Sequence, residues 1–259
     1  MPPLRDLFDL SDQVAIVTGG SRGLGLEMAE GLGEAGARVV ITARREPELQ
    51  DAAAHLRGLG IEVLTFAGSV AEPGTAPALV AATRQAFGRI DILVNNAGTT
   101  WGAPTLEMPL ERWQQVLDVN LTGTWVLSQA VCRVLVEQGQ GGRVINIASV
   151  AGLKGEREGV LPTIGYATSK AGLIGLTRTL ASHMAPHGIL VNAIAPGFFP
   201  TKMSKVVIER TGEQIAAATP LGRVGRPGEL KGVAVFLASA ASSYITGQVL
   251  PVDGGISIW

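Results

Sequence analysis

Tyr166 and Lys170 are four positions apart in a segment whose apolar residues follow helical spacing. This separation places both side chains on one face of a helix, with their Cβ atoms about 5–6 Å apart. An ammonium group at that distance would lower the pKa of the phenol from its usual value of about 10. A phenol with a lowered pKa can donate or accept a proton at physiological pH. The pair therefore indicates general acid/base chemistry, although Y-x-x-x-K alone often occurs by chance.

Polar residues also follow two apolar runs upstream of this pair. The segment Asn95-Asn96-Ala97-Gly98 comes at the end of one run, and Ser149 ends the next. Both runs have the composition of buried strands. Ligands bind at the carboxyl ends of the strands in parallel sheets. We therefore expect Ser149 and the Asn-Gly segment to lie beside Tyr166.

A glycine-rich segment, Thr18-Gly19-Gly20-Ser21-Arg22-Gly23-Leu24-Gly25, connects the first expected strand to a helix. Gly19 can form the tight turn, Gly23 lets the backbone approach a phosphate, and Gly25 lets the helix pack near the strand. The free N–H groups and the dipole of the helix then face an anion. The G-x-x-x-G-x-G spacing differs from the commoner G-x-G-x-x-G, but its context favours a dinucleotide site.

Two other interpretations of the glycine segment are weaker. It also matches G-x-S-x-G, with Ser21 as a would-be nucleophile. A hydrolase would need a downstream histidine, and all three histidines lie in or at the end of helical patterns. A Walker P-loop is excluded because no Lys-Ser/Thr follows the glycines.

His183 and His187 are four positions apart, which is a possible spacing for two metal ligands on a helix. Pro186 disrupts the turn between them, so we expect no metal site.

The residues after the second expected strand distinguish between the two nicotinamide coenzymes. An acidic residue there would bind the ribose 2′-hydroxyl of NAD and repel a 2′-phosphate. The strand instead ends in Ala43-Arg44-Arg45, with no acid before Glu46. Arg44 can pair with a 2′-phosphate, and Arg22 adds a second positive charge. The sequence therefore favours NADP(H) and leaves NAD(H) as the alternative. In a purely structural interpretation, Arg44 and Arg45 are solvated charges at a strand end that bind no ligand.

Short β-branched runs alternate with longer helical patterns along the whole chain. This alternation implies parallel strand pairing with crossovers, and thus an α/β doubly wound sheet with helices on both faces. Seven strands in one series favour a single domain over residues 1–259. The expected strands are residues 14–18, 38–43, 62–67, 90–95, 143–149, 190–195 and 248–252, and a long helix covers about 109–137.

Composition narrows the class of protein further. The 259 residues are 46% hydrophobic and 17% charged, which excludes disorder as the main state. A net charge of −1 gives no indication of a nucleic-acid partner. The single cysteine, Cys132, excludes an intrachain disulfide framework and suits a reducing compartment. Residues 232–252 carry no charge, but polar residues and Pro251 interrupt them. We expect a buried helix and a strand there, no membrane span, and a cytoplasmic protein.

Together and in this order, the motifs resemble those of the short-chain dehydrogenase/reductase family. The resemblance covers essentially the whole chain and implies a Rossmann-type fold, a homotetramer and hydride transfer between NADP(H) and a secondary alcohol or ketone. Within the family, the chain is similar to 3-oxoacyl-carrier-protein reductases and gluconate 5-dehydrogenase-like members. A 3-oxoacyl thioester and a polyol or keto-sugar therefore both stay open as substrates. The matching elements are Thr18-Gly19-x-x-x-Gly23-x-Gly25, Asn95-Asn96-Ala97-Gly98, Asn120, Ser149, Tyr166-x-x-x-Lys170 and Pro196-Gly197.

The resemblance also implies a role for each matching residue. Tyr166 would be the general acid/base and Ser149 would hydrogen-bond the substrate oxygen. Lys170 would hold the nicotinamide ribose and tune Tyr166, while Asn120 would anchor a water that links Lys170 to solvent. A substrate-binding loop is expected at about residues 197–226. The coenzyme-binding residues implied in this way are Gly19, Ser21, Arg22, Gly23, Leu24, Gly25, Arg44, Ser69, Val70, Asn96, Ala97, Gly98, Tyr166, Lys170, Pro196, Gly197 and Thr201.

Three features qualify these expectations. Ser69 stands where the family usually has an aspartate, which leaves a weaker acceptor for adenine. The separation of Ser149 and Tyr166 is a few residues longer than usual, and charges in the extra loop at 152–162 either bind a polar substrate or keep the loop soluble. Among the tryptophans, Trp101 is the best candidate for touching substrate, and packing in the core or an interface is the alternative. A non-catalytic redox sensor that binds the dinucleotide is the alternative function, although binding alone does not require Ser149.

Overall fold

The computed structural model describes residues 3–155 and 161–258. Within them, seven strands form one parallel sheet in the order β3-β2-β1-β4-β5-β6-β7. Each strand boundary lies within two residues of its expected position, so the expected fold class is confirmed. The strands are β1 (Val14–Thr18), β2 (Arg38–Ala43), β3 (Val63–Ala67), β4 (Ile92–Asn95), β5 (Gly142–Ile147), β6 (Ile189–Pro196) and β7 (Val249–Val252).

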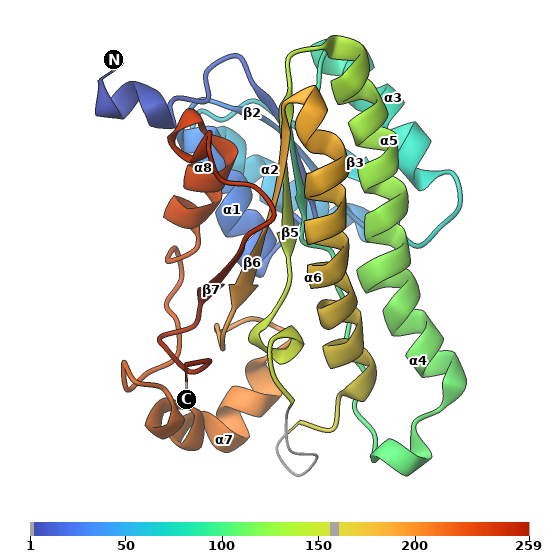
Figure 1. Cartoon of the computed structure of the whole chain (residues 1–259), viewed down its shortest axis with the longest axis vertical. Helices are drawn as coiled ribbons and strands as arrows, with labels where there is room; N and C mark the ends of the chain where they lie inside the picture. The colour runs from blue at the N-terminus through green and yellow to red at the C-terminus, as the bar shows by residue number, and fades with distance from the viewer. Residues whose placement is uncertain (1–2, 156–160, 259) are drawn as a thin grey trace.

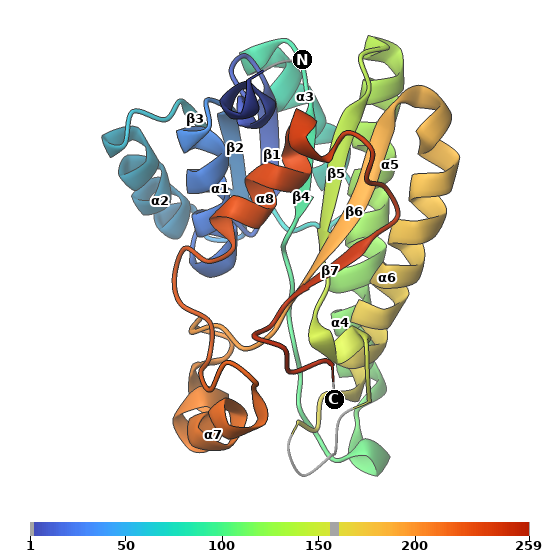
Figure 2. The same cartoon turned by 60° about the vertical axis from the view of Figure 1, so that its left-hand side comes forward.

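Helices cover both faces of this sheet (Figures 1 and 2). One layer contains α1, α2 and α8, and the opposite layer contains α3, α5 and α6. The helices are α1 (Gly23–Glu34), α2 (Glu46–Gly58), α3 (Thr75–Phe87), α4 (Leu110–Leu117), α5 (Gly123–Gln138), α6 (Ile164–Met184), α7 (Lys205–Ala218) and α8 (Lys231–Ala238). Short 3₁₀ turns cover Leu4–Phe8, Thr105–Glu107, Val150–Gly152, Ala185–His187 and Ala240–Ser242.

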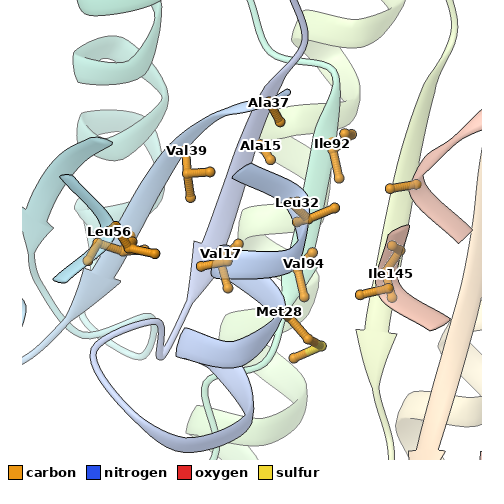
Figure 3. Packing of buried hydrophobic residues seen from close by; sticks show 14 of the residues in the cluster. Ala15, Val17, Met28, Leu32, Ala37, Val39, Leu56, Ile92, Val94 and Ile145 are labelled. Atoms are coloured by element: carbon orange, nitrogen blue, oxygen red, sulfur yellow. The ribbon is translucent and has the colours of Figure 1, made fainter. Parts of the chain in front are cut away.

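Alternate residues of the central strand β1 pack into the two layers. Ala15 and Val17 lie in the layer that contains Met28 of α1 (Figure 3), whereas Val14 and Ile16 lie in the opposite layer. All four β1 residues are fully buried, as expected for a parallel sheet between helices. Burying one large aliphatic side chain contributes about 1.5–3 kcal/mol. This packing fixes where the carboxyl ends of β1 and β4 lie, and these two ends carry the glycine-rich segment and the Asn-Gly segment.

Residues 110–138 form one helical run, in which the π-helical turn Asp118–Thr122 joins α4 to α5. By length and composition alone this run could cross a membrane, and half of its most apolar window is buried in the protein. Leu127, Val131 and Leu135 pack in the layer with α3 and α6, which accounts for its apolar character. The uncharged stretch 232–252 forms part of α8 and the strand β7, as expected.

Candidate active site

The glycine-rich segment forms a tight connection between β1 and α1. Gly19 and Gly23 have φ angles of +64° and +53°, a region in which glycine is strongly favoured. Gly25 has a different function, because an added Cβ would lie 2.3 Å from both Gly19 O and Asn96 Nδ2. The expected turn at Gly19 and the close helix–strand packing at Gly25 are therefore present in the structure.

The carboxyl ends of β1 and β4 are held together by hydrogen bonds. The backbone N–H groups of Asn96 and Ala97 both donate to Thr18 Oγ1 at 2.9 Å. The Asn96 side-chain amide donates to Thr18 O, also at 2.9 Å. From β1 the chain continues to β2 and β3 on one side, and from β4 it continues to β5, β6 and β7 on the other. At such a reversal of strand order, a crevice opens between the two strand ends.

Ser149, Tyr166 and Lys170 meet in this crevice. Ser149 follows β5 by two residues and begins the turn Val150–Gly152, where its hydroxyl accepts a hydrogen bond from the Ala151 N–H at 3.2 Å. A side-chain hydrogen bond joins Ser149 to Tyr166. Lys170 Nζ lies 5.6 Å from the centre of the Tyr166 ring, as expected for two residues one helical turn apart.

The Lys170 ammonium group is buried and donates to Ile147 O at 2.6 Å. Burial lowers the pKa of Lys170 to about 8. Burial raises the pKa of Tyr166, while the hydrogen bond from Ser149 acts in the opposite direction. The sequence-based expectation that Lys170 lowers the pKa of Tyr166 is therefore not met. Desolvation of the phenol outweighs the favourable contact.

Asn120 lies in the π-helical turn, and both ends of its side-chain amide are hydrogen-bonded. Its Oδ1 accepts from the Thr99 N–H at 2.8 Å, and its Nδ2 donates to Thr99 O and Ser169 Oγ, each at 2.9 Å. A Cβ added to Gly98 would lie 3.5 Å from Asn120 Oδ1 and 3.8 Å from Lys170 Nζ. Asn120 and Lys170 therefore flank Gly98. π-Helical turns are frequent at functional sites, and this one carries Asn120.

A cleft of about 530 Å³ contains the crevice. With the exception of Asn120, every site residue inferred from the sequence lines it: Gly19, Ser21, Arg22, Gly23, Leu24, Gly25, Arg44, Ser69, Val70, Asn96, Ala97, Gly98, Ser149, Tyr166, Lys170, Pro196, Gly197 and Thr201. Asn120 is 1% exposed and lies behind this lining.

Sequence reasoning missed several residues at the β2 end of the cleft. Arg45, Glu48, Thr42 and Lys202 also line it there. Glu48 accepts hydrogen bonds from Arg22 Nη1 at 2.8 and 2.9 Å and from Arg45 Nη1 at 2.9 Å. The sequence pattern pointed to no acid before Glu46, whereas Glu48 enters from the first turn of α2. An acid within one turn of the following helix was the available signal.

This end of the cleft fits a phosphorylated ligand. Among the described residues, the Arg44 side chain has no hydrogen-bond or ion-pair partner. Thr42 Oγ1 is buried and also has no hydrogen-bond partner within the described part of the chain. A free guanidinium matches the donor geometry that a phosphate prefers. The residues present therefore suit the 2′-phosphate of NADP(H).

The opposite end of the cleft has a mixed lining. Thr99, Gln115 and Thr163 contribute polar groups, while Val119 and Leu161 contribute apolar surface. The loop expected at 197–226 includes α7 and adds Phe198, Phe199, Thr201, Lys202, Met203, Ser204 and Val207 to the lining.

Two sequence-based interpretations of the substrate end have different outcomes. Trp101 is absent from the described residues that line the cleft. Its ring instead packs beneath the guanidinium of Arg112, 4.3 Å from the ring centre. Among the charged residues of the 152–162 loop, Lys154 is described and donates a hydrogen bond to Ile256 O at 2.9 Å. The other charged residues, within 156–160, lie outside the described residues.

Comparisons with known proteins agree with this geometry. A family model described as enoyl-(acyl carrier protein) reductase matches residues 19–257. The chain is 41% identical to a 3-oxoacyl-[acyl-carrier-protein] reductase of Synechocystis sp., covering 95% of this chain and 98% of that protein. It is 38% identical to gluconate 5-dehydrogenase of Gluconobacter oxydans, with 98% of both chains covered.

Solved structures show the same relationship. A short-chain type dehydrogenase/reductase from Mycobacterium marinum superimposes with a TM-score of 0.94 at 39% identity, over 97% of this chain and 98% of that one. A gluconate 5-dehydrogenase from Burkholderia cenocepacia, solved in complex with NADP and tartrate, superimposes with a TM-score of 0.93 at 36% identity, over 99% and 100%. These matches extend over nearly the full length, and so this chain belongs to the short-chain dehydrogenase/reductase family of oxidoreductases.

Proposed function

We propose that this protein interconverts a secondary alcohol and a ketone, with NADP(H) as its preferred coenzyme. One observation carries the proposal: Tyr166, hydrogen-bonded to Ser149 and one helical turn from buried Lys170, lines the same cleft as the glycine-rich segment. A proton donor and a dinucleotide cradle in one crevice are what carbonyl reduction requires.

The bound coenzyme would supply the hydride, and the protein's own groups manage the charge. Reduction of a ketone places negative charge on the carbonyl oxygen. Ser149 and Tyr166 are both donors and can stabilise that charge, and Tyr166 can complete the reduction by giving up its proton. In the direction of alcohol oxidation, Tyr166 would take the proton back.

Lys170 has a role in both binding and proton movement. Its ammonium group has three N–H donors, and one is used by Ile147 O. The remaining donors are free to hold the nicotinamide ribose. Asn120, on the other side of Gly98, would anchor a water that connects Lys170 to solvent. The pKa of about 8 for Lys170 suits proton exchange near neutral pH.

The coenzyme preference follows from the glycine-rich segment and from the arginine that comes directly after β2. The N–H groups at the start of α1 would hold the pyrophosphate, and Arg44 with Arg22 would hold the 2′-phosphate. The NADP complex of the Burkholderia relative supports this choice. Replacing Arg44 with aspartate should weaken NADPH binding more than NADH binding, and equal weakening would contradict the assignment.

The substrate class has two candidates, a 3-oxoacyl thioester and a polyol or keto-sugar. Relatives of both kinds match over 98% of their length, and the mixed lining near Thr99 and Val119 suits either. A cytoplasmic homotetramer remains our proposal for location and assembly. The redox-sensor alternative is not favoured, because a protein that only binds the dinucleotide does not need Ser149 and Tyr166 to meet.

A spectrophotometric screen tests the proposed function. NADPH oxidation is followed at 340 nm with 3-oxoacyl thioesters and keto-sugars, and the reverse reaction with the corresponding alcohols. Wild-type protein should turn over at least one class, and Ser149→Ala should lower turnover by about 10²-fold while NADPH still binds. Binding without turnover of any carbonyl or alcohol would support the sensor instead.

A further inference from the structure

Glu48 is the one acid among the described residues that line the cleft. It lies at the β2 end with four cationic side chains, Arg22, Arg44, Arg45 and Lys202. Its carboxylate binds Arg22 and Arg45 directly, and the positive charge of Lys202 also acts on it. These interactions hold the pKa of Glu48 below its ordinary value, with the hydrogen bond to Arg45 as the largest cause.

The carboxylate occupies donors that a phosphate would otherwise use. Arg22 places a single Nη1 between both Glu48 oxygens, at 2.8 and 2.9 Å, and Arg45 donates to one of them. A 2′-phosphate is also anionic and needs the same charge-assisted donors. Glu48 therefore resembles the phosphate in charge and in partners, and the two compete for Arg22 and Arg45.

A coenzyme without the 2′-phosphate meets Glu48 differently. NAD(H) presents a ribose 2′-hydroxyl, and an acidic residue at this end of the sheet can accept a hydrogen bond from such a group. Glu48 lies near the β2 end from the first turn of α2, although β2 itself ends in Ala43 with no acid. The carboxylate therefore favours the hydroxyl and opposes the phosphate.

We propose that Glu48 sets the coenzyme selectivity of this protein by competing with the 2′-phosphate for Arg22 and Arg45. The inference rests on the proposed nucleotide site and adds a residue to it. The free Arg44 guanidinium attracts the phosphate, while Glu48 limits the contribution of the other two arginines. The preference for NADP(H) over NAD(H) is consequently smaller than it would be if all three arginines were free to bind the 2′-phosphate. The protein therefore also retains NAD(H) binding.

The test uses ligands that contain only the part of the coenzyme in question. Adenosine 2′,5′-bisphosphate and adenosine 5′-monophosphate differ in the 2′-phosphate, and calorimetry measures both affinities without any turnover. The variants are Glu48→Gln and, as a matched control, Glu46→Gln. Glu46 lies in the same first turn of α2, is exposed, contacts Gln50 and does not line the cleft. Both variants remove one negative charge and keep a side chain of the same size.

We expect Glu48→Gln to raise the bisphosphate-to-monophosphate affinity ratio by roughly three- to tenfold, since it releases two exposed ion pairs. Glu46→Gln should leave the ratio within about twofold, because Glu46 is not among the described residues that line the cleft and its exposed charge is screened. In an Arg22→Gln background, the effect of Glu48→Gln should fall to about half or less, because one of the two competing pairs is gone.

The outcomes separate the inference from the function on which it rests. If wild-type protein binds neither nucleotide, the proposed coenzyme site is wrong. If the wild-type protein prefers the bisphosphate but Glu48→Gln leaves the ratio unchanged, lowers it, or matches Glu46→Gln, the competition by Glu48 is refuted. A lowered ratio would show that Glu48 positions the arginines for phosphate.

Discussion

Replacing Gly25 with alanine should damage both stability and coenzyme binding, although alanine is the better helix former. Gly25 has no left-handed backbone, so an alanine is conformationally acceptable there. The problem is space, because the new Cβ would lie 2.3 Å from Gly19 O and from Asn96 Nδ2. One of these atoms belongs to the backbone of the glycine-rich segment and cannot rotate away.

The expected magnitude follows from two opposing effects. Overpacking costs about 1–3 kcal/mol, and contact with a backbone oxygen places Gly25→Ala near the upper value. Helix propensity favours alanine by about 1 kcal/mol. A net loss of about 2 kcal/mol corresponds to a fall in Tm of about 4–8 °C in a chain of this size. Because the clash moves the segment that cradles the pyrophosphate, NADPH affinity should also fall by about tenfold.

Thermal unfolding and NADPH fluorescence titration measure the two effects. Gly175→Ala is the matched control, since Gly175 is exposed within α6 and an added Cβ would meet nothing within 4 Å. That variant should raise Tm by about 2–4 °C through helix propensity and leave NADPH affinity unchanged. A Gly25→Ala protein with the Tm and NADPH affinity of the wild type would refute the close-packing argument.

Two further predictions concern the buried polar groups. Burial lowers the pKa of Lys170 from 10.5 to about 8, so the folded chain loses this proton at a lower pH than the unfolded chain. The contribution of Lys170 to the free energy of unfolding therefore rises as the pH increases from about 8 to 10.5. Urea unfolding should show the wild type gaining about 3 kcal/mol relative to Lys170→Met from pH 8 to 10.5, and a constant difference would contradict the lowered pKa. Asn120→Ala leaves the Thr99 N–H and carbonyl without their Asn120 partners, while Ser169 Oγ keeps its hydrogen bond to Tyr166 O. Urea unfolding should detect a loss of about 1–3 kcal/mol, and kcat should fall more than NADPH affinity; unchanged stability and kcat would count against the role of Asn120.

The fold could be predicted from the sequence because its signals are local. The first four residues of β1 are apolar, and the helix after it begins at a glycine-rich segment, so strand, turn and helix follow from adjacent residues. The strand ends were less certain. Ser149 was expected to end β5, but it lies two residues beyond Ile147, where its hydroxyl instead begins the next turn.

The parts of the site that sequence reasoning missed depend on contacts between distant segments. Glu48 reaches Arg22 across 26 positions, and no local pattern indicates that pairing. The raised pKa of Tyr166 comes from burial by the folded chain, which a four-residue spacing cannot reveal. Trp101 follows the Asn-Gly segment closely in sequence, yet its ring packs with Arg112 of α4, away from the cleft lining.

The role of Tyr166 is tested most directly by Tyr166→Phe, which removes the phenolic oxygen and keeps the ring. With a ketone found in the substrate screen, single-turnover oxidation of NADPH is followed at 340 nm, and the NADPH dissociation constant is measured on the same preparation. We predict a loss of about 10²–10⁴-fold in the rate, which is far larger than any change in the NADPH dissociation constant. A rate within a few fold of the wild type would show that the proton comes from another group.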